Sequence, residues 1–142
     1  MPNPYRGCCL CGGVKFEFDE FLPHVAHCHC SMCRKFHGAA YATYASVPRA
    51  KFRWIAGEHL LKGYTAGNGT TRTFCGHCGS SLMFFSPKAP EDVIEIALGT
   101  VDGTIPIQPD AHIFVAYGAN WAVINDGLPQ YTEGRDSAQV KQ

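Results

Sequence analysis

Seven of the eight cysteines lie in three short motifs, and their spacing restricts the folds that this chain can adopt. Cys9 and Cys11 form a C-x-C motif, and Cys75 and Cys78 form a C-x-x-C motif within CGHCG. Residues i and i+2 of an extended chain point to the same face, so a C-x-C motif can offer both sulfurs to one ion. The glycines of CGHCG permit a tight knuckle turn whose amides point at the sulfurs. Two such pairs supply the four ligands of a closed structural zinc site.

The third motif, HCHCSMC at 27–33, contains three thiols and two histidines. Its thiols belong to Cys28, Cys30 and Cys33. If 27–30 is extended, the first two of these share one face, while His27 and His29 share the other and are not natural ligands of the same ion. We expect these histidines to be hydrogen-bonded to backbone.

Cys33 follows Cys30 by three residues and can turn back to complete a set of three thiolates. Three protein ligands with one open position are the pattern of a catalytic zinc site. The spacing alone also permits Cys9 and Cys11 to join this middle cluster instead of the CGHCG pair. The eighth cysteine, Cys8, is expected to be a buried or spare thiol.

Length and composition predict one soluble domain over residues 1–142. The chain has 46% hydrophobic and 17% charged residues, so its composition does not favour disorder. Its first residues show no signal-peptide pattern, and the longest strongly apolar run, 82–85, is too short to span a membrane. We therefore expect a cytoplasmic protein, in which cysteines stay reduced and serve as metal ligands rather than as disulfides.

Charge is unevenly spread along a chain whose formal net charge is zero. Residues 34–88 hold eight Lys or Arg and only Glu58 as an acid, whereas 89–142 hold eight Asp or Glu and two basic residues. This pattern fits either ion pairs between the halves or a basic rim that attracts a small anionic substrate. Arg34 and Lys35 are the only adjacent basic residues, which argues against nucleic acid as a partner.

Period-two alternation of apolar residues predicts a mainly β fold of short strands. The clearest examples are 14–18 and 94–98. One helical turn is expected at 31–37, with Ser31 as N-cap and Gly38 as its stop. Trp54 and Trp121 are expected in the core. The other expected strands are 41–47, 51–55, 61–65, 71–74, 81–85 and 112–115.

Four stretches of the sequence together resemble the glutathione-dependent formaldehyde-activating enzyme family, whose domain is shared with centromere protein V. They are GCCLCGGVKF, HCHCSMCRKFHGA, RTFCGHCGSSL and HIFVAYGANWAVINDGLPQY, and they extend from residue 7 to residue 130. The resemblance implies an Mss4-like fold of several small coiled antiparallel sheets with a zinc knuckle. It also implies two zinc sites: a structural one at Cys9, Cys11, Cys75 and Cys78, and an exposed, more labile one at Cys28, Cys30 and Cys33.

The function that the resemblance implies is the joining of glutathione to formaldehyde as S-hydroxymethylglutathione, which is carbon–sulfur lyase chemistry. The partners are then a small-molecule thiol, such as glutathione, and an aldehyde, with no nucleic acid and no membrane. A thiol at the open position of a zinc ion loses its proton near neutral pH and becomes a nucleophile. The alternative is a non-catalytic zinc-dependent module that binds a thiol, glutathione or another protein.

Overall fold

The computed structural model describes residues 3–141, and its architecture is mainly β, as predicted. The chain forms two compact units that alternate along the sequence. Of the described residues, the first unit contains 3–23 and 45–107, and the second contains 24–44 and 108–141. The single domain expected over residues 1–142 stays a prediction. Among the described residues, no helix is long and apolar enough to cross a membrane.

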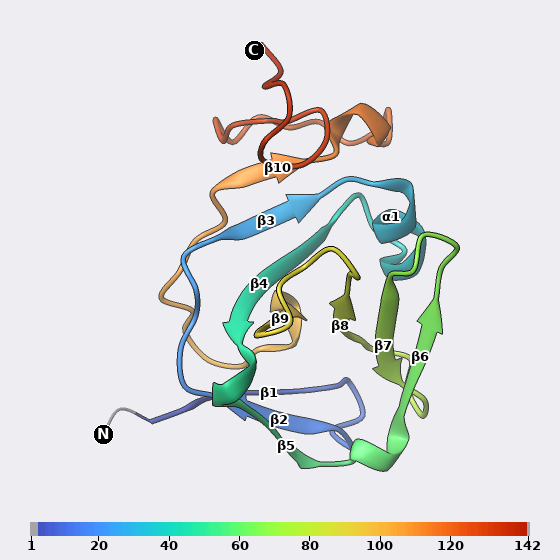
Figure 1. Ribbon diagram of the computed structural model, residues 1–142, viewed down its shortest axis with the longest axis vertical. Helices are drawn as coiled ribbons and strands as arrows, with labels where there is room; N and C mark the ends of the chain where they lie inside the picture. The colour runs from blue at the N-terminus through green and yellow to red at the C-terminus, as the bar shows by residue number, and fades with distance from the viewer. Residues whose placement is uncertain (1–2, 142) are drawn as a thin grey trace. The chain divides into compact units, whose positions relative to one another are not determined.

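A three-stranded antiparallel sheet forms one layer of the first unit (Figure 1). Its strands are β1 (Tyr5–Cys8), β2 (Lys15–Phe18) and β5 (Phe52–Ala56), in the order β1-β2-β5. Alternation along β2 buries Phe16 and Phe18, while Lys15 and Glu17 face the other side. Trp54 of β5 packs its edge against Phe16, with ring centroids 6.1 Å apart. Phe16 and Phe18 therefore contribute to the core, whereas Trp54, which was expected there, is half-buried beside them.

The remaining strands of the first unit form a second sheet in the order β4-β9-β8-β7-β6. Successive strands from β6 to β9 pair antiparallel, and alternate residues such as Leu82, Ile94 and Ile96 are buried. The tight turn between β7 and β8 contains the CGHCG motif. The bounds are β4 (Ala42–Pro48), β6 (Leu61–Thr65), β7 (Thr71–Cys75), β8 (Ser81–Phe85) and β9 (Val93–Ala97), with 3₁₀ turns η1 (Arg49–Lys51), η2 (Glu58–Leu60) and η3 (Leu98–Thr100).

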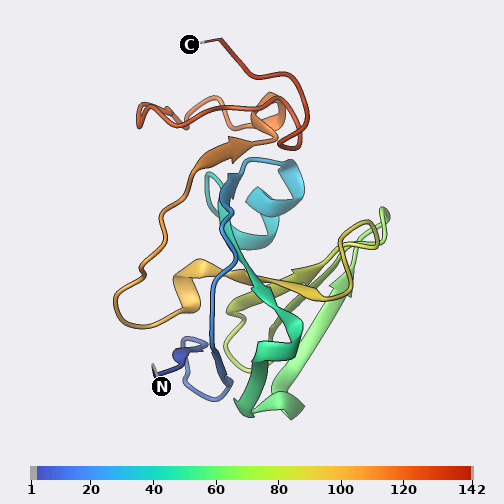
Figure 2. The same ribbon diagram turned by 60° about the vertical axis from the view of Figure 1, so that its left-hand side comes forward.

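The second unit is built on β3 (Val25–Cys28), which lies between β10 (Ala111–Ile113) and the first residues of β4. Unlike the pairs above, β10 and β3 run parallel, with His112 directly opposite His27. The helix α1 (Ser31–His37) follows β3, and the 3₁₀ turn η4 (Val115–Tyr117) follows β10. Figure 2 shows α1 beside β3 and the long C-terminal loop around η4.

The helix α1 has the predicted bounds but a different N-cap. Cys30, not Ser31, is the N-cap, and its Sγ accepts the amide hydrogen of Cys33 at 3.2 Å. Ser31 is instead the first helical residue and is exposed. Gly38 ends the helix with φ 60°, as predicted, because a residue without a Cβ adopts this left-handed conformation at little cost.

The predicted strands are confirmed to within two residues at their ends, and two strands were not predicted, β1 and β3. The strand expected at 112–115 ends at Ile113 because Phe114 has φ 57°, which breaks the extended run. The prediction that Trp121 lies in the core is wrong: it is 67% exposed, on the loop that follows η4.

Candidate metal centres

Four cysteines of the first unit bring their sulfurs to one point. The Sγ atoms of Cys9, Cys11, Cys75 and Cys78 all lie within 4.8 Å of one another. The separations are 3.4 Å from Cys9 to Cys11 and 3.9 Å from Cys11 to Cys75. A tetrahedral zinc ion with Zn–S bonds of about 2.3 Å places its sulfurs about 3.8 Å apart. The donor type and the spacing of this group therefore fit a zinc ion.

The first two sulfurs are presented by a tight turn between β1 and β2. Cys9 donates its amide hydrogen to the carbonyl of Val14 at 3.1 Å, and Gly12, with φ 76°, closes the turn. Two amides of this turn point back at the sulfurs: Val14 N lies 3.2 Å from Cys9 Sγ, and Gly13 N lies 3.4 Å from Cys11 Sγ. Amide hydrogens directed at sulfur stabilise a thiolate, the form that binds metal.

The other two sulfurs come from the turn that joins β7 to β8. Cys75 is the last residue of β7, and its carbonyl accepts the amide hydrogen of Gly79 at 2.8 Å. Hydrogen bonds from the hydroxyl and the amide of Ser80, and then from the amide of Cys11, lower the pKa of Cys78 to about 5. These donors favour the thiolate form of Cys78, which is the form that binds metal.

The third motif forms a separate group of three sulfurs in the second unit. Cys28 ends β3, Cys30 caps α1 and Cys33 lies in its first turn, and their Sγ atoms lie within 4.8 Å of one another. Cys28 and Cys33 are 8% and 4% exposed, and Cys30 is half-buried. Hydrogen bonds with Cys30 and Cys33, together with burial, raise the pKa of Cys28. Three crowded thiols resist joint ionisation, and a divalent cation offsets that repulsion.

The two histidines of this motif do not rely on the backbone partners that the sequence suggested. His27 Nδ1 lies 2.7 Å from Thr43 Oγ1, and His29 Nε2 lies 2.8 Å from His112 Nδ1. His112 Nε2 in turn lies 2.8 Å from Asp126 Oδ2. Burial and then the neighbouring His112 lower the pKa of His29 to about 4, so this ring is neutral at pH 7.

A hollow of about 350 Å³ opens beside His29 in the second unit. Its wall is mixed: Ala122 and Ile124 are among the apolar lining residues, and His29 and Gln130 are among the polar ones. Gly118 brings its backbone within reach of the His29 ring, because a Cβ at this position would lie 3.6 Å from His29 Nδ1. His29 stands between Cys28 and Cys30 in the sequence, but none of Cys28, Cys30 and Cys33 is among the residues that line this hollow.

Residues 4–117 match the family model described as "Glutathione-dependent formaldehyde-activating enzyme". The chain belongs to this family. The matched segment contains all seven cysteines of the three motifs. The sequence resemblance is therefore confirmed at the level of the family.

Individual relatives agree with the family assignment. A Halomonas elongata protein named "Putative glutathione-dependent formaldehyde-activating enzyme" is 31% identical over 126 residues, which cover 84% of this chain and 80% of the relative. A Schizosaccharomyces pombe protein named as an uncharacterized lyase is 25% identical over 59% of this chain and 58% of its own length. A crystal structure of a Rhodobacter sphaeroides protein superposes with a TM-score of 0.60 and 27% identity, covering 71% of this chain and 91% of that one.

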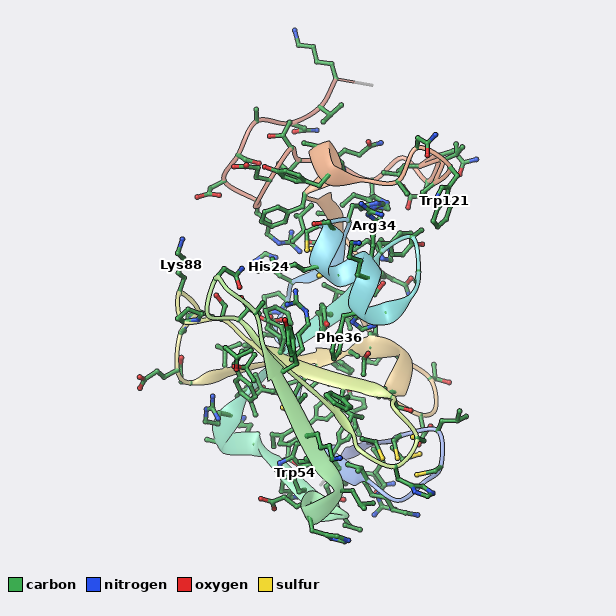
Figure 3. All side chains as sticks on the ribbon, turned by 90° about the vertical axis from the view of Figure 1, so that its right-hand side faces the viewer. His24, Arg34, Phe36, Trp54, Lys88 and Trp121 are labelled. Atoms are coloured by element: carbon green, nitrogen blue, oxygen red, sulfur yellow. The ribbon has the colours of Figure 1, made fainter. Side chains whose placement is uncertain are left out.

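The structure also places the basic pair Arg34 and Lys35 and the leftover thiol Cys8 that the sequence singled out. The Arg34 side chain donates a hydrogen bond to the carbonyl of Tyr117 at 3.1 Å, which ties α1 to η4. Figure 3 shows Arg34 at the helix and Trp121 on the loop beyond η4. Lys35 is exposed. Cys8 lies outside the four-cysteine group and points its sulfur to Asp102, 3.7 Å from Oδ2.

Proposed function

We propose that this chain is a zinc-dependent enzyme of the carbon–sulfur lyase type that forms or cleaves a thiol–aldehyde adduct such as S-hydroxymethylglutathione. The observation that carries the proposal is the convergence of three sulfurs, those of Cys28, Cys30 and Cys33, in a fold whose other cysteine group has four. A tetrahedral ion held by three protein ligands keeps one position for a substrate. The family description and the lyase name of one relative agree with this chemistry.

The two cysteine groups would then have different roles. We assign the group of Cys9, Cys11, Cys75 and Cys78 to a structural zinc ion, because four thiolates complete its coordination. We assign Cys28, Cys30 and Cys33 to a second, more labile zinc ion that takes part in the reaction. The histidines next to these cysteines have side-chain partners of their own, so three thiolates make up the protein's share of the second set.

The reaction adds a thiol across a carbonyl group and changes no oxidation state. The substrate sulfur forms a bond to the aldehyde carbon, the carbonyl π electrons move to oxygen, and the proton lost by the thiol ends on that oxygen. A zinc ion held by the three cysteines would stabilise the substrate as a thiolate near neutral pH. Three thiolates and one dication leave a net charge of minus one, which disfavours ionisation of bound water and so favours thiol chemistry over hydrolysis.

We assign the hollow beside His29, the residue between Cys28 and Cys30 in the sequence, to the organic part of a small thiol substrate. Its volume of about 350 Å³ lies at the lower end of ligand pockets, so it suits a small thiol or the cysteinyl portion of glutathione better than a large ligand. Ala122 and Ile124 would contact the carbon chain, and Gln130 would offer a hydrogen-bonding amide. We therefore propose glutathione or a smaller thiol, together with a short aldehyde, as the substrates.

Exchange spectroscopy by NMR tests the proposal, because free formaldehyde and its thiol adduct give separate signals. Metal-replete protein should increase the rate of exchange between glutathione and S-hydroxymethylglutathione above the spontaneous rate. Cys33→Ser should abolish the increase, and Cys8→Ser, which changes a thiol outside both groups, should retain it. A chain that binds the thiol without accelerating exchange would be a carrier, and that result would overturn the enzymatic proposal.

A further inference from the structure

A third group of metal-binding side chains lies in the second unit, apart from both cysteine groups. It consists of His27, His112 and Asp126, whose ligand atoms all lie within 4.8 Å of one another. We propose that these three residues form a binding site for a divalent transition-metal ion. Two imidazoles and one carboxylate suit zinc and related ions, and three protein ligands leave room for water to complete the coordination.

The strand pairing holds the two imidazoles side by side. His27 on β3 and His112 on β10 are directly opposite each other in a parallel pair, and their ring centroids are 4.8 Å apart. His112 is only 2% exposed, so packing restricts its ring. Successive side chains of a strand point to opposite faces, so His27 faces away from Cys28 and does not compete for the ion of the three-cysteine group.

Two of the three proposed ligands are oriented by a partner on their other polar atom. His27 Nδ1 lies 2.7 Å from Thr43 Oγ1, which leaves Nε2 for an ion. Asp126 Oδ1 accepts the amide hydrogen of Leu128 at 3.1 Å, which leaves Oδ2. Outer partners of this kind fix the orientation of metal ligands and are a regular feature of metal sites.

The third ligand, His112, follows the same rule. Its Nδ1 lies 2.8 Å from His29 Nε2, and its Nε2 lies 2.8 Å from Asp126 Oδ2. A tetrahedral ion with bonds of about 2.0 Å holds neighbouring ligand atoms about 3.3 Å apart. An ion can thus replace the proton shared by His112 and Asp126 if the two atoms separate by about 0.5 Å. The Asp126 side chain is 42% exposed, so such a movement meets little resistance and the ion has a path from solvent.

The charge of the group also favours a cation. Asp126 contributes one negative charge, and the two imidazoles bind metal in their neutral form. A divalent ion would leave this site with one net positive charge, which water or a small anion can offset. The proposal does not depend on the function assigned to the three-cysteine group, because it involves none of its sulfurs.

Cadmium-113 NMR of the full chain can test the site directly. Cadmium bound by thiolates resonates far downfield of cadmium bound by nitrogen and oxygen, so the three groups give distinguishable signals. At saturating cadmium we expect a signal in the nitrogen and oxygen range in addition to the thiolate signals. If only thiolate signals appear at saturation, His27, His112 and Asp126 form a hydrogen-bonded network and the proposal is wrong.

Variants then assign the signal to these residues. Asp126→Asn keeps the size of the side chain and should remove the nitrogen and oxygen signal while the thiolate signals remain. Asp110→Asn is the matched control, since Asp110 pairs with Arg135 outside the group, and it should keep all signals. Thr43→Val removes the partner of His27 and should weaken metal binding about 10- to 100-fold. A nitrogen and oxygen signal that survives in Asp126→Asn would place the ion elsewhere and overturn the assignment.

Discussion

Replacement of Cys75 by serine should destabilise the protein far more than replacement of Cys33. Cys75 is fully buried, and its sulfur belongs to a group that joins Cys11 to a residue 64 positions away. In the chain-entropy treatment of a cross-link, closing a loop of this length contributes about 4 kcal/mol. Cys28 and Cys33 are five positions apart, and closing so short a loop contributes only about 2 kcal/mol. Domains of this size have a total stability of about 5–15 kcal/mol.

Urea unfolding followed by circular dichroism, at a fixed zinc concentration, measures the difference. We expect Cys75→Ser to lose about 4 kcal/mol or more, or to be insoluble. Cys33→Ser should lose about 2 kcal/mol or less and keep about one thiolate-bound zinc ion. Cys8→Ser should retain both the zinc and the stability of the unmodified chain. The assignment of structural and reactive groups would have to be abandoned if Cys33→Ser unfolded as readily as Cys75→Ser.

Three further predictions concern metal removal, backbone geometry and pH. Brief treatment with a chelator should lower the thiolate-bound metal from about two ions to about one, because the three-cysteine set lacks a fourth protein ligand. The thiolate signals in cadmium-113 NMR measure this loss, and equal loss from both cysteine groups would contradict the prediction. Gly57→Ala should lower the melting temperature and the zinc content. Gly57 has φ 76°, and a Cβ there would collide with the carbonyl of Gly13 beside the first cysteine turn. An unchanged melting temperature would refute this prediction. The hydrogen bond from Arg53 lowers the pKa of Asp19, so this pair stabilises the fold above the unfolded pKa of about 4 and the contribution is lost as pH falls through the folded value. Urea unfolding at a series of pH values should therefore show a smaller acid-induced loss in Arg53→Gln than in the unmodified chain, and equal losses would argue against the pair.

The sequence predicted the strands that show a clear alternation of apolar residues or are bounded by turn residues. Alternation along 14–18 and turn residues around 66–70 were sufficient to place β2, β6 and β7. It did not predict β1, because YRGC has no clear alternation and contains a glycine that packs closely on Phe16. It also missed β3, a strand of four residues whose parallel partner β10 lies more than eighty positions along the chain. Strands of this kind are specified by tertiary packing rather than by local propensity.

For the candidate sites too, the sequence predicted groups of residues close together in the chain but not groups that the fold brings together from distant segments. Spacing alone defined the group of Cys28, Cys30 and Cys33, because its members lie within six residues. Spacing left open which motif would join the first C-x-C pair, and the fold answers this by bringing the turn after β1 to the turn after β7. Asp126 was missed altogether, because nothing in its sequence neighbourhood indicates that it lies beside two histidines from distant strands.

Because a cysteine of the three-cysteine group caps helix α1, the stability of this helix depends on the state of that group. An isolated helix of seven residues is unstable in water, so α1 depends on its ends and its packing. Its N-terminal end is closed by the sulfur of Cys30, which accepts the amide hydrogen of Cys33, and a thiolate is a stronger acceptor than a thiol. Ionisation of this sulfur and its binding to a metal ion should therefore stabilise the first turn of the helix. Slower hydrogen exchange of the Cys33 and Arg34 amides would then show that the site is occupied, without a measurement of enzymatic turnover.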